Sequence, residues 1–148
     1  MESFKINTKW TRKSDDFNFD HYNRSHAIIF SGNQLLLNSA APTYKGDENM
    51  SNPEELLASA VSSCHMLTFL AVASKSGYTV DSYEDDAVAF LEKNESNVVS
   101  VTKIILHPDI KFSGEKIPDE EKLKGLHDKA HRNCFIANSV KCAVEVVF

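Results

Sequence analysis

The sequence predicts an α+β fold in which antiparallel sheets pack on a long central helix and a second helix. Three observations predict it: β-rich runs over residues 4–38 and 79–112, a long helical pattern over 52–77, and a shorter one over 113–134 followed by a β-rich end. Strands, helix, strands, helix and strand, in that order, are typical of this fold class. The length of 148 residues fits a single domain, residues 1–148.

Composition narrows the class of protein and its partners. Hydrophobic residues make up 42% of the chain and charged residues 25%, as in an ordinary globular protein. A net charge of −5 without a basic patch argues against nucleic acid or an anionic membrane as partner. No apolar h-region follows Met1, and the longest apolar run is far short of a membrane span. We therefore expect a cytoplasmic protein that folds without structural disulfides or metal.

The N-terminal third predicts strands. Residues 4–11 alternate apolar and polar side chains, which indicates a strand with two different faces. Two further β-rich runs, Ala27–Phe30 and Gln34–Asn38, flank Ser31-Gly32-Asn33. A short polar sequence with glycine between two such runs predicts a hairpin.

The long helix carries clear start and stop signals. Asn52 suits the N-cap, Pro53 the first helical position, and Glu55 the capping-box position. Gly77 suits the position just after the last turn.

One stripe of this helix predicts its inner face. The stripe has apolar spacings of 3, 4, 3 and 4 and consists of Leu57, Ala60, Cys64, Leu67 and Ala71. Periodicity alone favours Cys64 as a small core residue. A second cysteine, Cys134, ends the second helical pattern, and two such cysteines can serve as an attacking and a resolving thiol. Sequence separation alone leaves open whether the two meet.

The C-terminal half predicts strands, a helix and a final strand. A turn at residues 92–96 divides the β-rich run over 79–112. Pro118 and the three acids that follow it suit the start of the second helix. Its inner face is predicted to consist of Leu123, Leu126 and Ala130. Residues 141–148 alternate as a strand, with Cys142 on the apolar side as core packing.

Two segments resemble a known family. "NPEELLASAVSSC" is similar to the first cysteine segment of the osmotically inducible protein C and organic hydroperoxide resistance (OsmC/Ohr) family, and Glu54 and Cys64 have the family's spacing. "AHRNCFIANSVKCAVEVVF" resembles the second cysteine segment, and "SSCHMLTFLAVASKSGYTVDSYEDDAV" resembles an OsmC-like subgroup. The resemblance covers about residues 20–148.

The resemblance implies a thiol-dependent peroxidase that reduces organic hydroperoxides. Cys64 would be the peroxidatic cysteine and Cys134 the resolving cysteine. Such an enzyme needs no metal or bound organic cofactor, and an external dithiol such as dihydrolipoamide would reduce it. The family also implies an intertwined homodimer with two active sites at the subunit interface.

An arginine and a glutamate are expected to activate the thiol. The glutamate matches Glu54; Arg24 is the preferred arginine and Arg12 the alternative. A guanidinium beside a cysteine favours the thiolate, and a carboxylate orients the guanidinium. Ten residues of helix rise ~15 Å, so Glu54 cannot reach its own Cys64 directly. We therefore expect each complete site to take residues from two chains.

Departures from the pattern keep other functions open. Many family members have Pro after the second cysteine, where this chain has Phe135, so a non-catalytic binding or structural protein is one alternative. A zinc site that uses Cys64, His65, His131 and Cys134 is another, although the spacing of these residues does not match known zinc motifs. His65 is expected to be structural or solvent-facing, His131 to share a face with Cys134, and His26 to share a strand face with Arg24.

Overall fold

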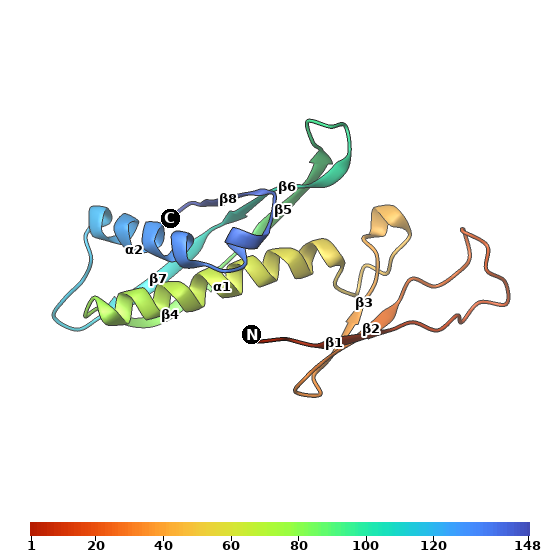
Figure 1. Cartoon of the computed structure of the whole chain (residues 1–148), viewed down its shortest axis with the longest axis horizontal. Helices are drawn as coiled ribbons and strands as arrows, with labels where there is room; N and C mark the ends of the chain where they lie inside the picture. The colour runs from red at the N-terminus through yellow and green to blue at the C-terminus, as the bar shows by residue number, and fades with distance from the viewer. The chain divides into compact units, whose positions relative to one another are not determined.

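The computed structural model describes all residues, 1–148 (Figure 1). The chain forms two compact units, residues 1–56 and residues 57–148. Helix α1 (Pro53–Lys75) begins in the first unit and continues through the second. The architecture is α+β, as the sequence predicts.

The first unit contains a three-stranded antiparallel sheet. Its strands β1 (Ile6–Lys9), β2 (His26–Phe30) and β3 (Leu35–Asn38) pair in the order β1-β2-β3. Asn33, in the turn between β2 and β3, has a φ of 59°. The predicted hairpin is therefore confirmed, and a short 3₁₀ helix, η1 (Pro42–Tyr44), follows β3.

Gly46 lies where the loop after η1 folds back on itself. A Cβ atom at this position would be 1.5 Å from the carbonyl oxygen of Ala40, which is a backbone clash. We expect Gly46→Ala to destabilise the protein by about 1–3 kcal/mol, because the loop has to move. Urea unfolding followed by circular dichroism would measure this. Gly32→Ala is the matched control, since no atom lies within 4 Å of its added Cβ; equal unfolding midpoints for the two variants would contradict the prediction.

The ends of α1 follow the sequence signals. The backbone N–H of Asn52 donates to Glu55 Oε2 at 3.0 Å, and the N–H of Glu55 donates to Asn52 Oδ1 at 3.0 Å. These two bonds form the predicted capping box. At the other end, Gly77 adopts a φ of +76° and its N–H donates to the carbonyl of Ser74. This conformation favours glycine and ends the helix.

The face of α1 that packs inward differs from the predicted stripe. The buried residues of the helix are Ala58, Val61, His65, Phe69 and Ala73. In the predicted stripe, Ala60, Leu67 and Ala71 are exposed, and Cys64 is half-buried. The helix is apolar on nearly all sides, so its periodicity could not select the face that meets the sheets.

The longest uninterrupted apolar run of the chain is short, as the sequence indicates, but helix α1 as a whole is long and apolar. By length and composition its 23 residues could span a membrane. Scattered Leu, Val, Phe and Ala side chains raise its hydropathy without forming a continuous apolar run. The core helix of a globular protein passes the same test, and five side chains of α1 are buried within this structure.

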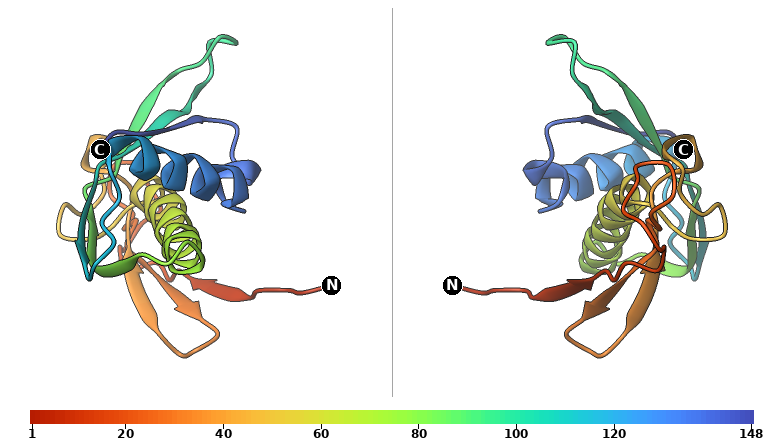
Figure 2. Two further views of the ribbon diagram at one scale, coloured as in Figure 1. Left: turned by 90° about the vertical axis from the view of Figure 1, so that its left-hand side faces the viewer. Right: turned by 90° about the vertical axis from the view of Figure 1, so that its right-hand side faces the viewer.

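The second unit contains two sheets. The two-stranded sheet pairs β4 (Thr79–Asp85) with β7 (Pro108–Ser113), and the other sheet has the order β5-β6-β8. Strands β5 (Val88–Lys93) and β6 (Val99–Leu106) form a hairpin, which projects from the rest of this unit in Figure 2. The final strand β8 (Ala143–Val146) pairs with β6 in parallel, so this sheet is mixed.

Helix α2 (Glu120–Asn133) packs beside α1 within this unit (Figures 1 and 2). The side chain of its N-cap, Asp119, accepts a hydrogen bond from the N–H of Lys122. Leu126 and Ala130 are buried, and Leu123 packs against them, as predicted. A short 3₁₀ helix, η2 (Ala137–Ser139), connects α2 to β8.

Two hydrophobic clusters hold the second unit together. One joins Phe69 and Ala73 of α1 to α2 and to the sheet of β4 and β7. The other joins Ala58 and Val61 of α1 to Ile104 and Leu106 of β6. Because α1 contributes to both clusters, its residues 58–73 have a fixed position within this unit.

Candidate thiol site

The thiols of Cys64 and Cys134 lie next to each other in the second unit. Cys64 belongs to the middle of α1, and Cys134 is the C-cap of α2. Both are free thiols, and their side chains are in hydrogen-bonding contact. The fold therefore brings together the two cysteines whose proximity the sequence could not establish.

The two sulfur atoms differ in accessibility. Cys134 is completely buried, whereas Cys64 is half-buried and lines an open cleft. Burial, followed by the hydrogen bond with Cys64, raises the pKa of Cys134 to about 11. Cys134 is therefore a protonated thiol at neutral pH, and Cys64 is the sulfur that a solute can reach.

Two consecutive backbone amides donate to the two sulfur atoms. The N–H of Ile136 donates to Cys64 Sγ at 3.5 Å, and the N–H of Ala137 donates to Cys134 Sγ at 3.4 Å. The sequence gives no sign of these donors, because every residue except proline has a backbone N–H. The segment between α2 and η2 is thus part of the candidate site.

The cleft beside Cys64 has a volume of about 710 Å³ and is mostly apolar. Leu67 and Val72 of α1 line it, together with Phe135 and Ile136 after α2. Leu67 is 60% exposed and Phe135 is 81% exposed. Large apolar side chains that remain exposed around a cleft are typical of a binding surface or a protein interface.

Arg24 and Arg12 both bind carbonyl groups of their own loop. Arg24 donates from Nη1 to the carbonyl of Tyr22 and from Nη2 to that of Phe19, and its guanidinium lies 4.2 Å from the centre of the Tyr22 ring. Arg12 donates to the carbonyls of Ser14 and Asp15. Neither arginine forms an ion pair with Glu54 in this chain.

Glu54 has an unpartnered carboxylate oxygen. Its Oε2 atom is buried and has no hydrogen-bond partner. A buried carboxylate oxygen without a hydrogen-bond donor costs free energy, so a donor or cation beside it would stabilise the protein.

Both ring nitrogens of His26 lie within hydrogen-bonding distance of groups in the first unit. Its Nδ1 atom lies 2.9 Å from the carbonyl oxygen of Arg24, and its Nε2 atom lies 3.0 Å from Asn38 Nδ2. Arg24 lies before strand β2, which begins at His26, so the two residues do not share a strand face, although both line one pocket of the first unit.

His65 is buried, so of the two positions that the sequence leaves open, structural or solvent-facing, it has the structural one. Its Nε2 atom lies 3.1 Å from Nδ1 of His127, and the two rings stack at 5.4 Å between centroids. Burial lowers the pKa of each ring to about 4. His127 is a site residue that the sequence prediction missed, although its position next to Leu126 of the predicted α2 stripe is a signal for burial.

The histidine pair predicts lower stability in acid. The folded-state pKa values lie below the ordinary value of 6.5, so the unfolded chain binds more protons between about pH 6.5 and pH 4. Stability is therefore full above pH 6.5 and falls as the pH drops through this range. We expect a loss of about 2–4 kcal/mol from pH 7 to pH 5, measured by urea unfolding at both values.

A double variant, His65→Phe with His127→Phe, provides the test of this assignment. It keeps two stacked rings but removes both titrating groups, so its stability should change much less between pH 7 and pH 5. His107→Gln is the control, because His107 is exposed and lies outside the pair. An unchanged pH dependence in the double variant would contradict the prediction.

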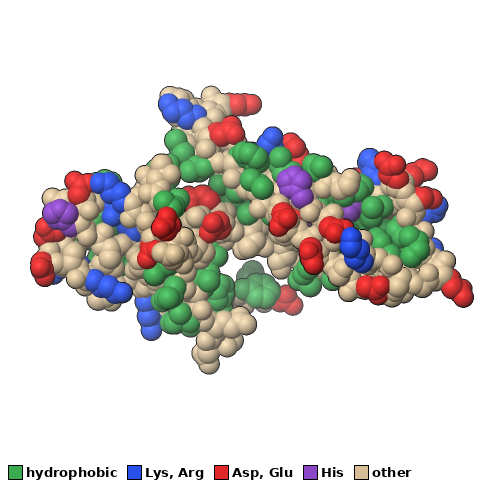
Figure 3. Space-filling model, turned by 180° about the vertical axis from the view of Figure 1, so that it is seen from behind, with side chains coloured by type: hydrophobic (Ala, Val, Ile, Leu, Met, Phe, Trp, Pro, Cys, Tyr) green, Lys and Arg blue, Asp and Glu red, His purple; other side chains and the backbone are tan.

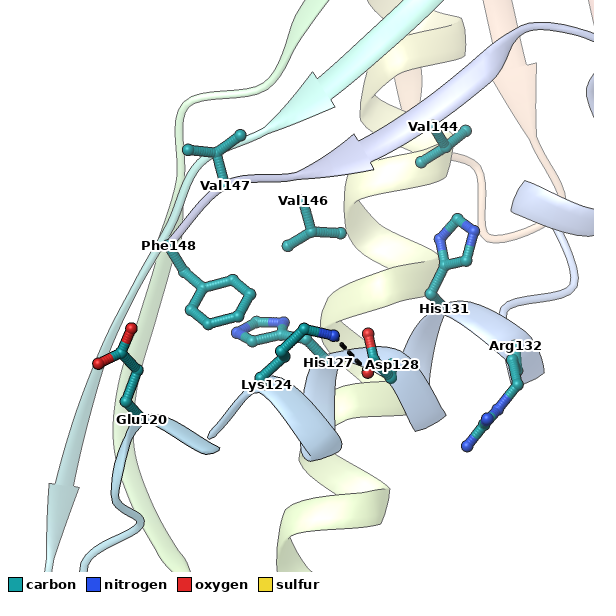
Figure 4. Close-up of a pocket in the computed structure, with 10 residues that line it drawn as sticks. All are labelled: Glu120, Lys124, His127, Asp128, His131, Arg132, Val144, Val146, Val147 and Phe148. Atoms are coloured by element: carbon teal, nitrogen blue, oxygen red, sulfur yellow. Dashed lines mark hydrogen bonds and ion pairs between the residues drawn. The ribbon is translucent and has the colours of Figure 1, made fainter. Parts of the chain in front are cut away.

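A second cleft, also of about 710 Å³, lies between α2 and β8 and contains neither Cys64 nor Cys134 (Figure 4). Figure 4 shows His127 and Phe148 side by side, with ring centroids 4.3 Å apart. His131, on the same helix, lines this cleft rather than the cleft of Cys64.

Neither Cys142 nor the four residues of the zinc alternative form a binding site in the structure. Cys142 packs in the cluster of Ile104 and Leu106, as the alternation of β8 predicts. No three His, Cys, Asp or Glu side chains converge as they would around a metal ion. His65 contacts His127 and Cys64 contacts Cys134, so the four residues of the zinc alternative do not form one cluster.

Comparison with known proteins identifies the family. A family model described as OsmC-like protein matches residues 46–148, so the chain belongs to the OsmC-like family. It is 41% identical to an OsmC-like protein of unknown function from Vibrio cholerae, whose structure superposes with a TM-score of 0.93 over 99% of this chain and 100% of that one.

A more distant solved structure shares the fold, and a further relative matches in sequence. The organic hydroperoxide resistance protein OhrB of Bacillus subtilis is 18% identical, with a TM-score of 0.67 over 99% of this chain and 98% of that one. The uncharacterized protein YmaD of Bacillus subtilis is 25% identical over 119 residues, which cover 80% of this chain and 79% of YmaD.

Proposed function

We propose that this protein is a thiol-dependent peroxidase that reduces organic hydroperoxides. The observation that carries the proposal is the pair of contacting thiols, one at the surface of an apolar cleft and one buried behind it. Membership of the OsmC-like family supports it, and a structural neighbour is named an organic hydroperoxide resistance protein.

The proposed first step oxidises Cys64. Its thiolate attacks the terminal oxygen of the hydroperoxide, the O–O bond breaks, and an S–O bond forms. Cys64 becomes a sulfenic acid, and the alkoxide leaves as an alcohol after taking up a proton. The apolar walls of the cleft, which include Leu67 and Val72, favour an organic group on the peroxide.

The proposed second step joins the two cysteines. The Cys134 sulfur attacks the sulfenic acid at Cys64, an S–S bond forms and water leaves. An external dithiol then reduces the disulfide by two exchange steps and is itself oxidised to a disulfide. Because Cys134 is buried, the dithiol has access to the sulfur of Cys64 first. The cytoplasm supplies the reducing conditions that this cycle requires.

A second copy of the chain would complete each site. In this proposal residues 1–148 act as one domain, and two domains form an intertwined homodimer. Glu54 leaves a buried oxygen unpartnered, and Leu67 and Phe135 leave apolar surface exposed beside Cys64. Hydrophobic side chains also reach the surface at several places in Figure 3. Arg24 and Glu54 from the partner would then orient the peroxide and stabilise the thiolate.

Mass spectrometry after exposure to one equivalent of cumene hydroperoxide tests the proposal. We expect a disulfide between the Cys64 and Cys134 peptides and one equivalent of the alcohol. A sulfenic acid at Cys64 without the disulfide would support the first step alone. Unchanged thiols with intact peroxide would overturn the proposal and favour the alternative, a non-catalytic OsmC-like protein.

A further inference from the structure

We propose that the backbone N–H of Ile136 is a catalytic hydrogen-bond donor that stabilises the Cys64 thiolate. The inference rests on the proposed function, because it assigns a group that contacts the reacting sulfur. It differs from the expected activation by arginine and glutamate, since the donor belongs to the same chain and to the backbone.

The contact has the geometry of a hydrogen bond to sulfur. The nitrogen of Ile136 lies 3.5 Å from Cys64 Sγ, and no carbonyl oxygen accepts from this N–H. Cys64 Sγ accepts from this amide, which also interacts with the sulfur of Cys134. A hydrogen bond to a charged acceptor is stronger than one to a neutral acceptor, so this N–H favours the thiolate over the thiol.

Several backbone bonds hold the donor in place. The carbonyl of Ile136 accepts from the N–H groups of Ser139 and Val140, at 2.9 Å and 3.2 Å. The N–H of Asn138 donates to the carbonyl of Cys134 at 3.1 Å. The amide at 136 is thus fixed before the reaction, which is the arrangement that stabilises charge without reorganisation.

The next backbone amide, that of Ala137, contacts the other thiol, Cys134, which is fully buried. The N–H of Ala137 donates to Cys134 Sγ, but burial raises the pKa of that cysteine to about 11. The same short segment therefore contacts one sulfur that stays a thiol and one that can carry the charge. Because Cys64 lines the open cleft and Cys134 is fully buried, this proposal gives the role of nucleophile to Cys64 and that of resolving thiol to Cys134.

Ile136→Pro is the direct test. Proline removes the N–H donor together with the isoleucine side chain, and the φ of −71° at Ile136 suits a proline ring. Ile136→Ala is the matched control, since it loses the same side-chain contacts but keeps the N–H. The readout is the pH profile of Cys64 alkylation by iodoacetamide in a Cys134→Ser, Cys142→Ser background, in which Cys64 is the only cysteine.

We expect the thiolate fraction at a given pH to fall about tenfold in Ile136→Pro, so the midpoint of its profile moves up by about one pH unit relative to Ile136→Ala. Equal midpoints in the two variants would overturn the inference. Peroxide reduction by the wild type is measured separately. Equal midpoints with active wild type reject only the role of Ile136, whereas inactive wild type rejects the proposed function.

An NMR measurement needs no proline variant and covers the case in which that variant does not fold. In the ¹⁵N-labelled wild type, the amide proton of Ile136 should shift downfield as Cys64 ionises, with the same midpoint as alkylation. The shift should be absent in Cys64→Ser. An Ile136 amide signal that does not respond to the titration would contradict the inference.

Discussion

Replacing Cys64 by serine is expected to abolish peroxide reduction. A serine hydroxyl is a far weaker nucleophile than a thiolate at neutral pH, and no other thiol of the chain lines the apolar cleft. We expect the rate of cumene hydroperoxide consumption, measured by stopped-flow with excess dithiol, to fall at least about 10³-fold, to the background rate of the dithiol alone.

Cys142→Ser is the matched control for this variant. Cys142 packs in the core beside β6 and does not line the cleft of Cys64, so its variant should retain the wild-type rate. Cys64→Ser should also keep the circular dichroism spectrum of the wild type, because serine is close to cysteine in size. Equal rates for wild type and Cys64→Ser would rule out Cys64 as the site of peroxide attack.

Replacing Cys134 by serine is expected to separate the two steps of the cycle. The first turnover should proceed, because Cys64 and its Ile136 donor are unchanged. The sulfenic acid at Cys64 should then persist, since no second thiol is in contact with it. Dimedone labelling after one equivalent of peroxide should therefore mark Cys64 strongly in this variant and weakly in the wild type.

Excess peroxide gives a second readout for Cys134→Ser. A sulfenic acid that is not resolved reacts again with peroxide, so sulfinic acid should accumulate at Cys64 over repeated additions. Wild-type protein with dithiol should show little of it. A variant that forms no sulfenic acid, or that cycles as fast as wild type without overoxidation, would remove Cys134 from the resolving role.

Much of the fold could be predicted because its signals are local. The capping box of Asn52 and Glu55, the glycine that ends α1, and the hairpin around Asn33 depend on neighbouring residues, and each is present. The inner face of α1 could not be predicted from a helix that is apolar on nearly all sides. The parallel pairing of β8 with β6 also depends on the path of the whole chain rather than on its sequence pattern.

The candidate site also has some features that the sequence predicts and others that only the fold shows. Both cysteines stand out in the sequence, but only the fold shows that α1 and the end of α2 place them in contact. The Ile136 donor could not be predicted, because any residue except proline has a backbone N–H. The pairing of His65 with His127 joins residues that are distant in sequence, and the histidine types alone did not indicate it.

Neighbouring residues on α1 belong to two separate environments. Cys64 lines the open cleft, while His65, the next residue, is sealed against His127. The buried histidine side limits how much acid the fold withstands, because burial lowers the pKa of both rings to about 4, whereas the cysteine side is open to solutes. Substitutions at the histidine pair can therefore change the acid tolerance of the fold without changing the lining of the cleft, although one turn of helix carries both.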